Sequence, residues 1–202
     1  MTLTAEQQAA IAAKVESMTL RRGMGDEYGA CSIAAINLAL TGRLTDEVPD
    51  CMSEVIGQWI IRVQDFMPDD TRNSAEWKSL LPLAVDTGRD HEQERQALIM
   101  DWLFDIVLPH VQPIADSGGY GKKWRDMCEK RTREAADAAY WAARAAYWMA
   151  DADNALDAAG AARAAEAAEA AWVAALASGD EEKAWKHFDP CALLKKLMEV
   201  GK

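Results

Sequence analysis

A glycine-rich loop between two predicted helices has the clearest potential for anion binding. Glycine lets the backbone approach a ligand closely, a helix N-terminus offers free N–H groups, and arginine pairs with phosphate. The candidate ligand-binding residues are Arg21, Arg22, Gly23, Gly25 and Gly29. A nucleotide-like small molecule would suit them. Against this, Asp26 and Glu27 would repel an anion, and the loop lacks the strand and lysine of a P-loop, so a purely structural glycine turn is the alternative.

The cysteines and histidines are too widely spaced to predict a shared site. No two cysteines have the C-x-x-C spacing of a zinc or redox centre, and no histidine pair has the helical spacing of metal ligands. The four cysteines are Cys31, Cys51, Cys128 and Cys191. His187 lies four residues before Cys191, which follows a predicted helix start, so a cysteine-dependent hydrolase is one alternative function. Free, buried thiols are the simpler interpretation.

Carboxylates on a predicted helix after Asp90 are a third candidate. Glu94 and Asp101 share a face of this helix, and Asp105 follows one turn later. Paired carboxylates can bind metal or transfer protons. Without a histidine or a second acidic helix nearby, a solvated stripe is the simpler interpretation. We therefore expect no metal, no cofactor and no catalytic residue.

Apolar residues at helical spacing predict an all-α protein, with about six helices before residue 118 and no strands. Thr4 with Gln7 forms a capping box for the first helix. A nearly apolar helix follows from Cys31 to Leu40 and ends at Gly42, and a long one ends near Met67. Asn73 or Ser74 then caps a helix bent by Pro82, and Asp90 caps one stopped by Pro109.

The composition changes after a glycine-rich hinge at 117–121, which predicts two domains, 1–118 and 119–202. Between Ala135 and Ala177, 24 of 43 residues are alanine, the strongest helix former. One helix of that length would span roughly 60 Å, so we expect a hairpin or extension broken at Asp153, Asn154 or Gly160. Asp189 and Pro190 then open a short C-terminal helix that packs back on the first domain.

A seven-residue repeat in this alanine-rich stretch predicts a contact seam. Tryptophans and small residues alternate along it, which lets two helices approach closely. Its members are Trp141, Ala145, Trp148 and Ala152. The seam fits either packing within the chain or an interface between copies of the chain. We predict a homo-oligomer, because the helix surface left after packing within the chain would still be mostly apolar.

Composition and charge narrow the class of protein. The chain has 202 residues and a net charge of −11, and the acidity is concentrated before residue 121. An acidic domain repels phosphate backbones, so direct nucleic-acid binding is not expected. The apolar stretches are shorter than a membrane span, and Met1 to Lys14 lacks the pattern of a signal peptide. We therefore expect a cytoplasmic protein that does not bind membranes.

Several segments resemble a group of bacterial and phage proteins. CSIAAINLALTG, PDCMSEVIGQWII and the terminal FDPCALLKKL resemble alanine-rich proteins of bacteria and their phages that have no assigned activity. The resemblance implies a phage or mobile-element accessory protein, such as an anti-defence protein, and carries no site residues. The leading functional hypothesis is a non-catalytic binding protein that sequesters a protein partner or a ligand.

Overall fold

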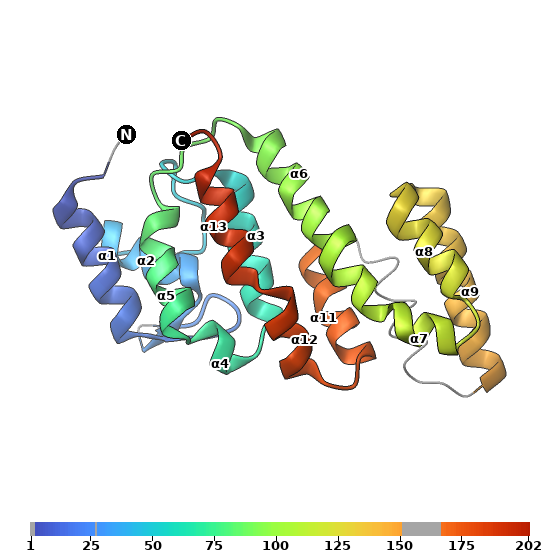
Figure 1. Cartoon of the computed structure of the whole chain (residues 1–202). Helices are drawn as coiled ribbons and strands as arrows, with labels where there is room; N and C mark the ends of the chain where they lie inside the picture. Colours follow the sequence, from blue (N-terminus) through green and yellow to red (C-terminus); the bar gives the residue numbers. More distant parts are fainter. Residues whose placement is uncertain (1–2, 27, 151–166) are drawn as a thin grey trace. The chain divides into compact units, whose positions relative to one another are not determined.

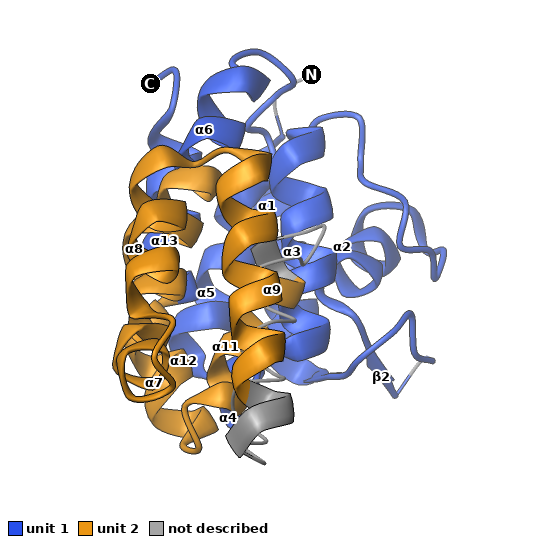
Figure 2. Cartoon of the chain, turned by 90° about the vertical axis from the view of Figure 1, so that its right-hand side faces the viewer, with its two compact units in different colours: residues 1–98, 190–202 blue, residues 99–189 orange. Residues whose placement is uncertain are grey.

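The computed structural model of the chain shows an all-α protein, as the sequence predicts (Figure 1). The structure describes residues 3–26, 28–150 and 167–202. The chain divides into two compact units, coloured separately in Figure 2. Unit 1 consists of Met1–Leu98 and Pro190–Lys202, and unit 2 of Ile99–Asp189. The boundary lies within a continuous helix rather than at the predicted position, residue 118, and the C-terminal helix belongs to unit 1.

Unit 1 is built around a short buried helix, α2, whose residues 32–37 are all buried. Helix α1 packs against α2 and α5, while α13 packs against α5 and α3. The elements are α1 (Ala5–Ser17), β1 (Thr19–Leu20), β2 (Gly29–Ala30), α2 (Ser32–Thr41), α3 (Glu54–Phe66), α4 (Asp69–Arg72), α5 (Ala75–Ala84), α6 (Glu92–Trp102, which continues into unit 2) and α13 (Pro190–Glu199).

Local signals in the sequence account for most helix ends of unit 1. The Thr4 hydroxyl accepts from the N–H of Gln7, and the Gln7 side chain accepts from the N–H of Thr4, which completes the predicted capping box. The hydroxyls of Ser53 and Ser74 cap α3 and α5 by accepting from the N–H groups of Ile56 and Trp77, respectively. Gly42 ends α2 with a left-handed φ of 71°, a conformation that favours glycine.

The prediction of no strands was wrong at one place in unit 1. Strands β1 and β2 form a two-residue parallel pair in which Thr19 faces Gly29 and Leu20 faces Ala30. The N–H of Arg21 also donates to the Ala30 carbonyl at 3.0 Å. The loop returns close to its starting point, so these backbone N–H and carbonyl groups form hydrogen bonds with one another. A strand of two residues is too short to show an alternation of apolar and polar residues in the sequence.

Unit 2 continues the helix begun by α6. Its further elements are η1 (Leu103–Val107, a π-helix), η2 (Leu108–Val111, a 3₁₀-helix), α7 (Gln112–Ser117), α8 (Gly121–Lys130), α9 (Arg133–Ala150), α11 (Ala167–Ala177) and α12 (Glu181–Phe188). Helices α8 and α9 lie side by side as a hairpin, and α11 packs against η1, η2 and α12. The predicted breaks at Asp153, Asn154 and Gly160 lie outside the described residues.

Pro109 does not stop the helix, contrary to the sequence prediction. The π-turn of η1 precedes it, with the N–H of Leu108 donating to the carbonyl of Leu103. Proline fits the first turn of the following 3₁₀ segment because no intrahelical donor is needed there. The helical path therefore runs from Glu92 to Ser117.

Within that 26-residue path, an 18-residue window with a mean hydropathy of 1.2 is apolar enough to cross a membrane by length and composition alone, and 28% of this window is buried in the protein. The sequence predicts no helix of this length, because Pro109 is expected to end it. A buried core helix of a water-soluble protein passes the same test, so length and composition by themselves do not establish a membrane span.

Candidate functional site

The loop between β1 and β2 is held together by the protein's own carboxylates. The Asp26 carboxylate accepts from the N–H groups of Tyr28 at 2.8 Å and Gly29 at 3.0 Å. These two hydrogen bonds, with a smaller contribution from the charge of Arg21, lower the pKa of Asp26. The N–H of Gly23 donates to Asp65 of α3 at 2.9 Å. A phosphate ligand would have to displace these carboxylates from the backbone donors.

Gly25 is required by the loop's own packing, and Gly29 lies against the Arg21 side chain. Gly25 has a φ of 78°, and a Cβ there would collide with the carbonyl of Gly29. A Cβ at Gly29 would lie 2.8 Å from Cδ of Arg21, whose side chain covers that backbone. Arg21 also lies 3.7 Å from the Asp26 carboxylate. The structure thus brings Arg21, Gly25 and Gly29 together in a folded loop. Gly29 is buried, whereas Arg21, Arg22, Gly23 and Gly25 are exposed.

The helix N-terminus behind this loop is buried and its donors are occupied. The N–H of Ser32 donates to the side-chain oxygen of Gln64 at 2.8 Å, and the N–H of Ala34 donates to the sulfur of Cys31 at 3.2 Å. Cys31, Ser32 and Ile33 are all buried. The arrangement therefore favours a structural turn over a phosphate cradle.

The thiols have the environment of structural cysteines. Burial raises the pKa of Cys31, and it raises the pKa of Cys128 to about 11, with the charge of Glu129 adding to the effect. Cys191 is also buried, and all four cysteines are free. A thiolate is the reactive form, so these shifts make Cys31 and Cys128 poorer nucleophiles than an exposed cysteine.

The candidate carboxylates contact arginine and histidine side chains instead of each other. Arg131 of unit 2 donates to Asp101 at 2.7 Å and to Asp105 at 2.6 Å, and its guanidinium lies 5.5 Å from the centroid of the Phe104 ring. Glu94 of unit 1 lies 2.9 Å from a ring nitrogen of His91. Within the described ranges, no three His, Cys, Asp or Glu side chains form a group able to hold a metal ion.

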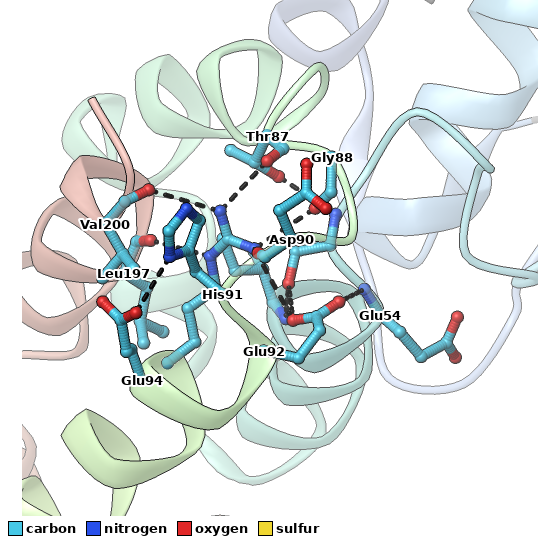
Figure 3. Close-up of polar contacts among 12 residues, drawn as sticks. Glu54, Thr87, Gly88, Asp90, His91, Glu92, Glu94, Leu197 and Val200 are labelled. Carbon is cyan, nitrogen blue, oxygen red and sulfur yellow. Dashed lines mark hydrogen bonds and ion pairs between the residues drawn. The ribbon is translucent and has the colours of Figure 1, made fainter.

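Two buried arginines were not singled out in the sequence. The Arg95 side chain is 2% exposed and donates to main-chain carbonyls at the end of α13 and in the loop before α6 (Figure 3). Its acceptors and their distances are Thr87 (3.0 Å), Gly88 (3.2 Å), Asp90 (2.5 Å), Leu197 (3.3 Å) and Val200 (3.4 Å). Arg72 binds the carbonyls of Leu20, Gln64 and Met67 in the same way. Both arginines join segments of unit 1, and a substrate has no access to either guanidinium.

Unit 1 has an open apolar groove of about 670 Å³ between α1 and α5. Small residues of α1 form one wall, and Leu83 of α5, which is 56% exposed, stands at the other. The lining is Ala5, Gln8, Ala9, Ala12, Ala13, Glu16, Lys78, Ser79, Pro82 and Leu83. The sequence analysis missed this surface. The signal was available, because α1 has alanine at exposed positions where an amphipathic helix usually has polar residues.

The two described members of the predicted contact seam, Trp141 and Ala145, lie on the exposed face of α9. Ala135, Ala139 and Ala143 are buried in unit 2, where α9 packs on α8. Trp141 is 60% exposed and Ala145 is exposed, so these two seam members are not used in that packing. The side chain of Trp148, and Ala152 as a whole, lie outside what the structure describes.

Comparison of the chain with protein-family models, curated proteins and solved structures finds no match.

Proposed function

We propose that the protein is a non-catalytic binding protein and that the groove between α1 and α5 receives a helix of a partner protein. The observation that carries the proposal is the groove itself: an apolar surface open to solvent, with an exposed leucine beside it. Contiguous exposed apolar surface is typical of protein-binding sites. An accessory role in holding a partner also agrees with the resemblance to phage-encoded alanine-rich proteins.

The shape of the groove favours a helix as the bound element. The alanines of α1 lie three and four residues apart, so a partner helix can approach closely without meeting large side chains. Gln8, Glu16 and Ser79 provide polar groups beside the apolar lining. This arrangement suits an amphipathic helix whose apolar face enters the groove while its polar face stays in water.

The two alternative functions have less support from the geometry. In the loop 21–30, the protein's own carboxylates occupy the backbone donors that a nucleotide phosphate would need. A cysteine-dependent hydrolase needs an accessible thiolate, whereas burial raises the pKa of Cys31 and Cys128. Binding through the groove requires no change in either region.

Photo-crosslinking can test the groove directly. A photoreactive amino acid at Ala12, in the lining, should capture one protein species in cells that naturally express the gene. The same amino acid at Ala10, which is exposed on α1 but outside the lining, is the matched control. Ala9→Glu with Ala12→Glu should abolish the crosslink made from a third position, Leu83, whereas Ala10→Glu should preserve it. No crosslink from Ala12, or equal capture from Ala10, would contradict the proposal.

A further inference from the structure

Helix α9 has an exposed surface of its own, independent of the groove in unit 1. Its exposed stripe contains Glu134, Ala138, Trp141 and Ala145. These positions are separated by four, three and four residues, which is the spacing of a coiled-coil seam. The buried stripe of Ala135, Ala139 and Ala143 lies on another side of the same helix. The exposed stripe is therefore available after α9 has packed in its own unit.

The composition of this stripe is that of an interface. Trp141 is 60% exposed, an unusual position for the largest apolar side chain. Arg144 lies beside it, with its guanidinium 5.9 Å from the Trp141 ring centroid and 5.7 Å from that of Tyr140. Tryptophan, tyrosine and arginine are the residues that contribute most often to binding energy in protein interfaces.

We infer that α9 pairs antiparallel with α9 of a second copy of the chain, with the two-fold axis passing between Ala139 and Tyr140. In this register, Trp141 of each copy lies over Ala138 of the other. Ala138 is small and partly exposed, so it provides the hole that the tryptophan fills. Ala145 of each copy then faces Glu134 of the other, which forms the second pair of seam positions. The interface is isologous because each contact occurs twice.

Charge complementarity favours the antiparallel direction. Asp137 and Arg144 flank the seam seven residues apart, with opposite signs. In the antiparallel register, Arg144 of each copy lies near Asp137 of the other, which forms two attractive pairs across the axis. Asp137 also has an interaction within its own chain, so the test must separate contacts between copies from contacts within one.

The size of the helix sets the expected affinity. The 18 residues of α9 span about 27 Å, so the pair forms an interface at the small end of those that associate specifically. We therefore expect a reversible dimer with a micromolar Kd. Sedimentation velocity of the full chain from low to high micromolar concentration should show monomer converting to dimer.

Charge reversal provides the decisive experiment. Asp137→Arg alone and Arg144→Asp alone should each be monomeric, because every pair across the axis becomes repulsive. An equimolar mixture of the two variants should form a heterodimer, because each pair then joins opposite charges. Contacts within one chain cannot produce this rescue. Circular dichroism should show the same helix content in both variants as in the wild type.

Two further variants complete the test. Trp141→Ala should weaken association at least tenfold, while Leu83→Ala, which removes an exposed apolar side chain of unit 1, should leave it unchanged. A wild type that stays monomeric at high micromolar concentration, or a mixture of charge-reversal variants that stays monomeric, would overturn the inference. Neither result would affect the groove proposal, which depends on crosslinking from unit 1.

Discussion

At the scale of single residues, the charged groups of unit 1 divide into exposed pairs and buried connectors. Arg89, which is about half exposed, lies 3.1 Å from Glu54 and 3.6 Å from Asp50. Arg95 is buried and donates to five main-chain carbonyls, three of them in residues 87–90 and two in residues 197–200. Exposed pairs contribute little to stability, whereas loss of a buried donor leaves its acceptors without a partner.

Replacement of Arg95 should therefore destabilise the protein strongly. We expect Arg95→Met to lower the free energy of unfolding by about 3 kcal/mol, because the carbonyls of Leu197 and Thr87 stay buried without that donor. Arg89→Met is the matched control and should cost less than about 1 kcal/mol. Urea denaturation followed by circular dichroism measures both. Similar midpoints for the two variants would show that Arg95 does not connect α13 to the rest of unit 1.

At the scale of elements, the change from π-helix to 3₁₀-helix determines which carbonyls remain available for side chains. The N–H of Gln112 donates to the carbonyl of Pro109. In a regular α-helix it would donate to the carbonyl of Leu108 instead. The Leu108 carbonyl accepts instead from the indole N–H of Trp124 in α8 at 2.7 Å. The irregular segment around Pro109 thus provides the acceptor that attaches α8.

Removal of that indole donor should be measurable. Trp124→Phe keeps an aromatic ring in the core but leaves the Leu108 carbonyl without its side-chain donor, which should cost about 1–3 kcal/mol of stability. Trp141→Phe makes the same chemical change on the exposed face of α9, and should leave monomer stability within about 0.5 kcal/mol. Thermal melts at low protein concentration compare the two. Equal melting temperatures would mean that the hydrogen bond to Leu108 contributes no net stability.

At the scale of the whole molecule, a stacked pair of histidines makes the stability of unit 2 sensitive to acid. In unit 2, His110 stacks on His187 with ring centroids 5.1 Å apart and meets the edge of Phe188. Burial lowers the pKa of His110, and the charges of His187 and Lys183 lower it further. His110 therefore binds a proton less readily in the folded state than in the unfolded chain, where its pKa is about 6.5.

Acidification should consequently destabilise unit 2. Well above pH 6.5, His110 is neutral in both states and its titration does not affect the free energy of unfolding. As the pH falls from about 6.5 toward the lowered pKa of the folded state, the unfolded chain binds the proton first, so the free energy of unfolding decreases. His110→Gln should make the fall in melting temperature between about pH 7.5 and about pH 5.5 shallower. His91→Gln, in unit 1, is the control. An unchanged slope in the His110 variant would show that this histidine is protonated equally in both states.

The sequence alone determined the features that depend on near neighbours in the chain. The capping box of Thr4 and Gln7, the left-handed end at Gly42 and the opening of α13 at Pro190 all involve groups within one turn of each other. Backbone hydrogen bonding and helix propensity act over that distance, so local patterns predicted these elements. The repeat containing Trp141 and Ala145 predicted a contact seam, and its place on one helix face followed from spacing, but the sequence did not show that these two residues are exposed.

Only the tertiary structure decided which of these residues remain accessible. Asp65 reaches the loop at Gly23 across 42 positions, and Arg95 reaches Leu197 across 102, so no local pattern could show that these donors and acceptors are occupied. The path of the helix through Pro109 depended on a π-turn followed by a 3₁₀ segment, and the Leu108 carbonyl that the 3₁₀ segment leaves free accepts from Trp124 of α8. The groove depends on the exposure of α1 after Ile11 and Val15 are buried. Burial is a property of the packed chain, because each apolar face competes with all the others for the core.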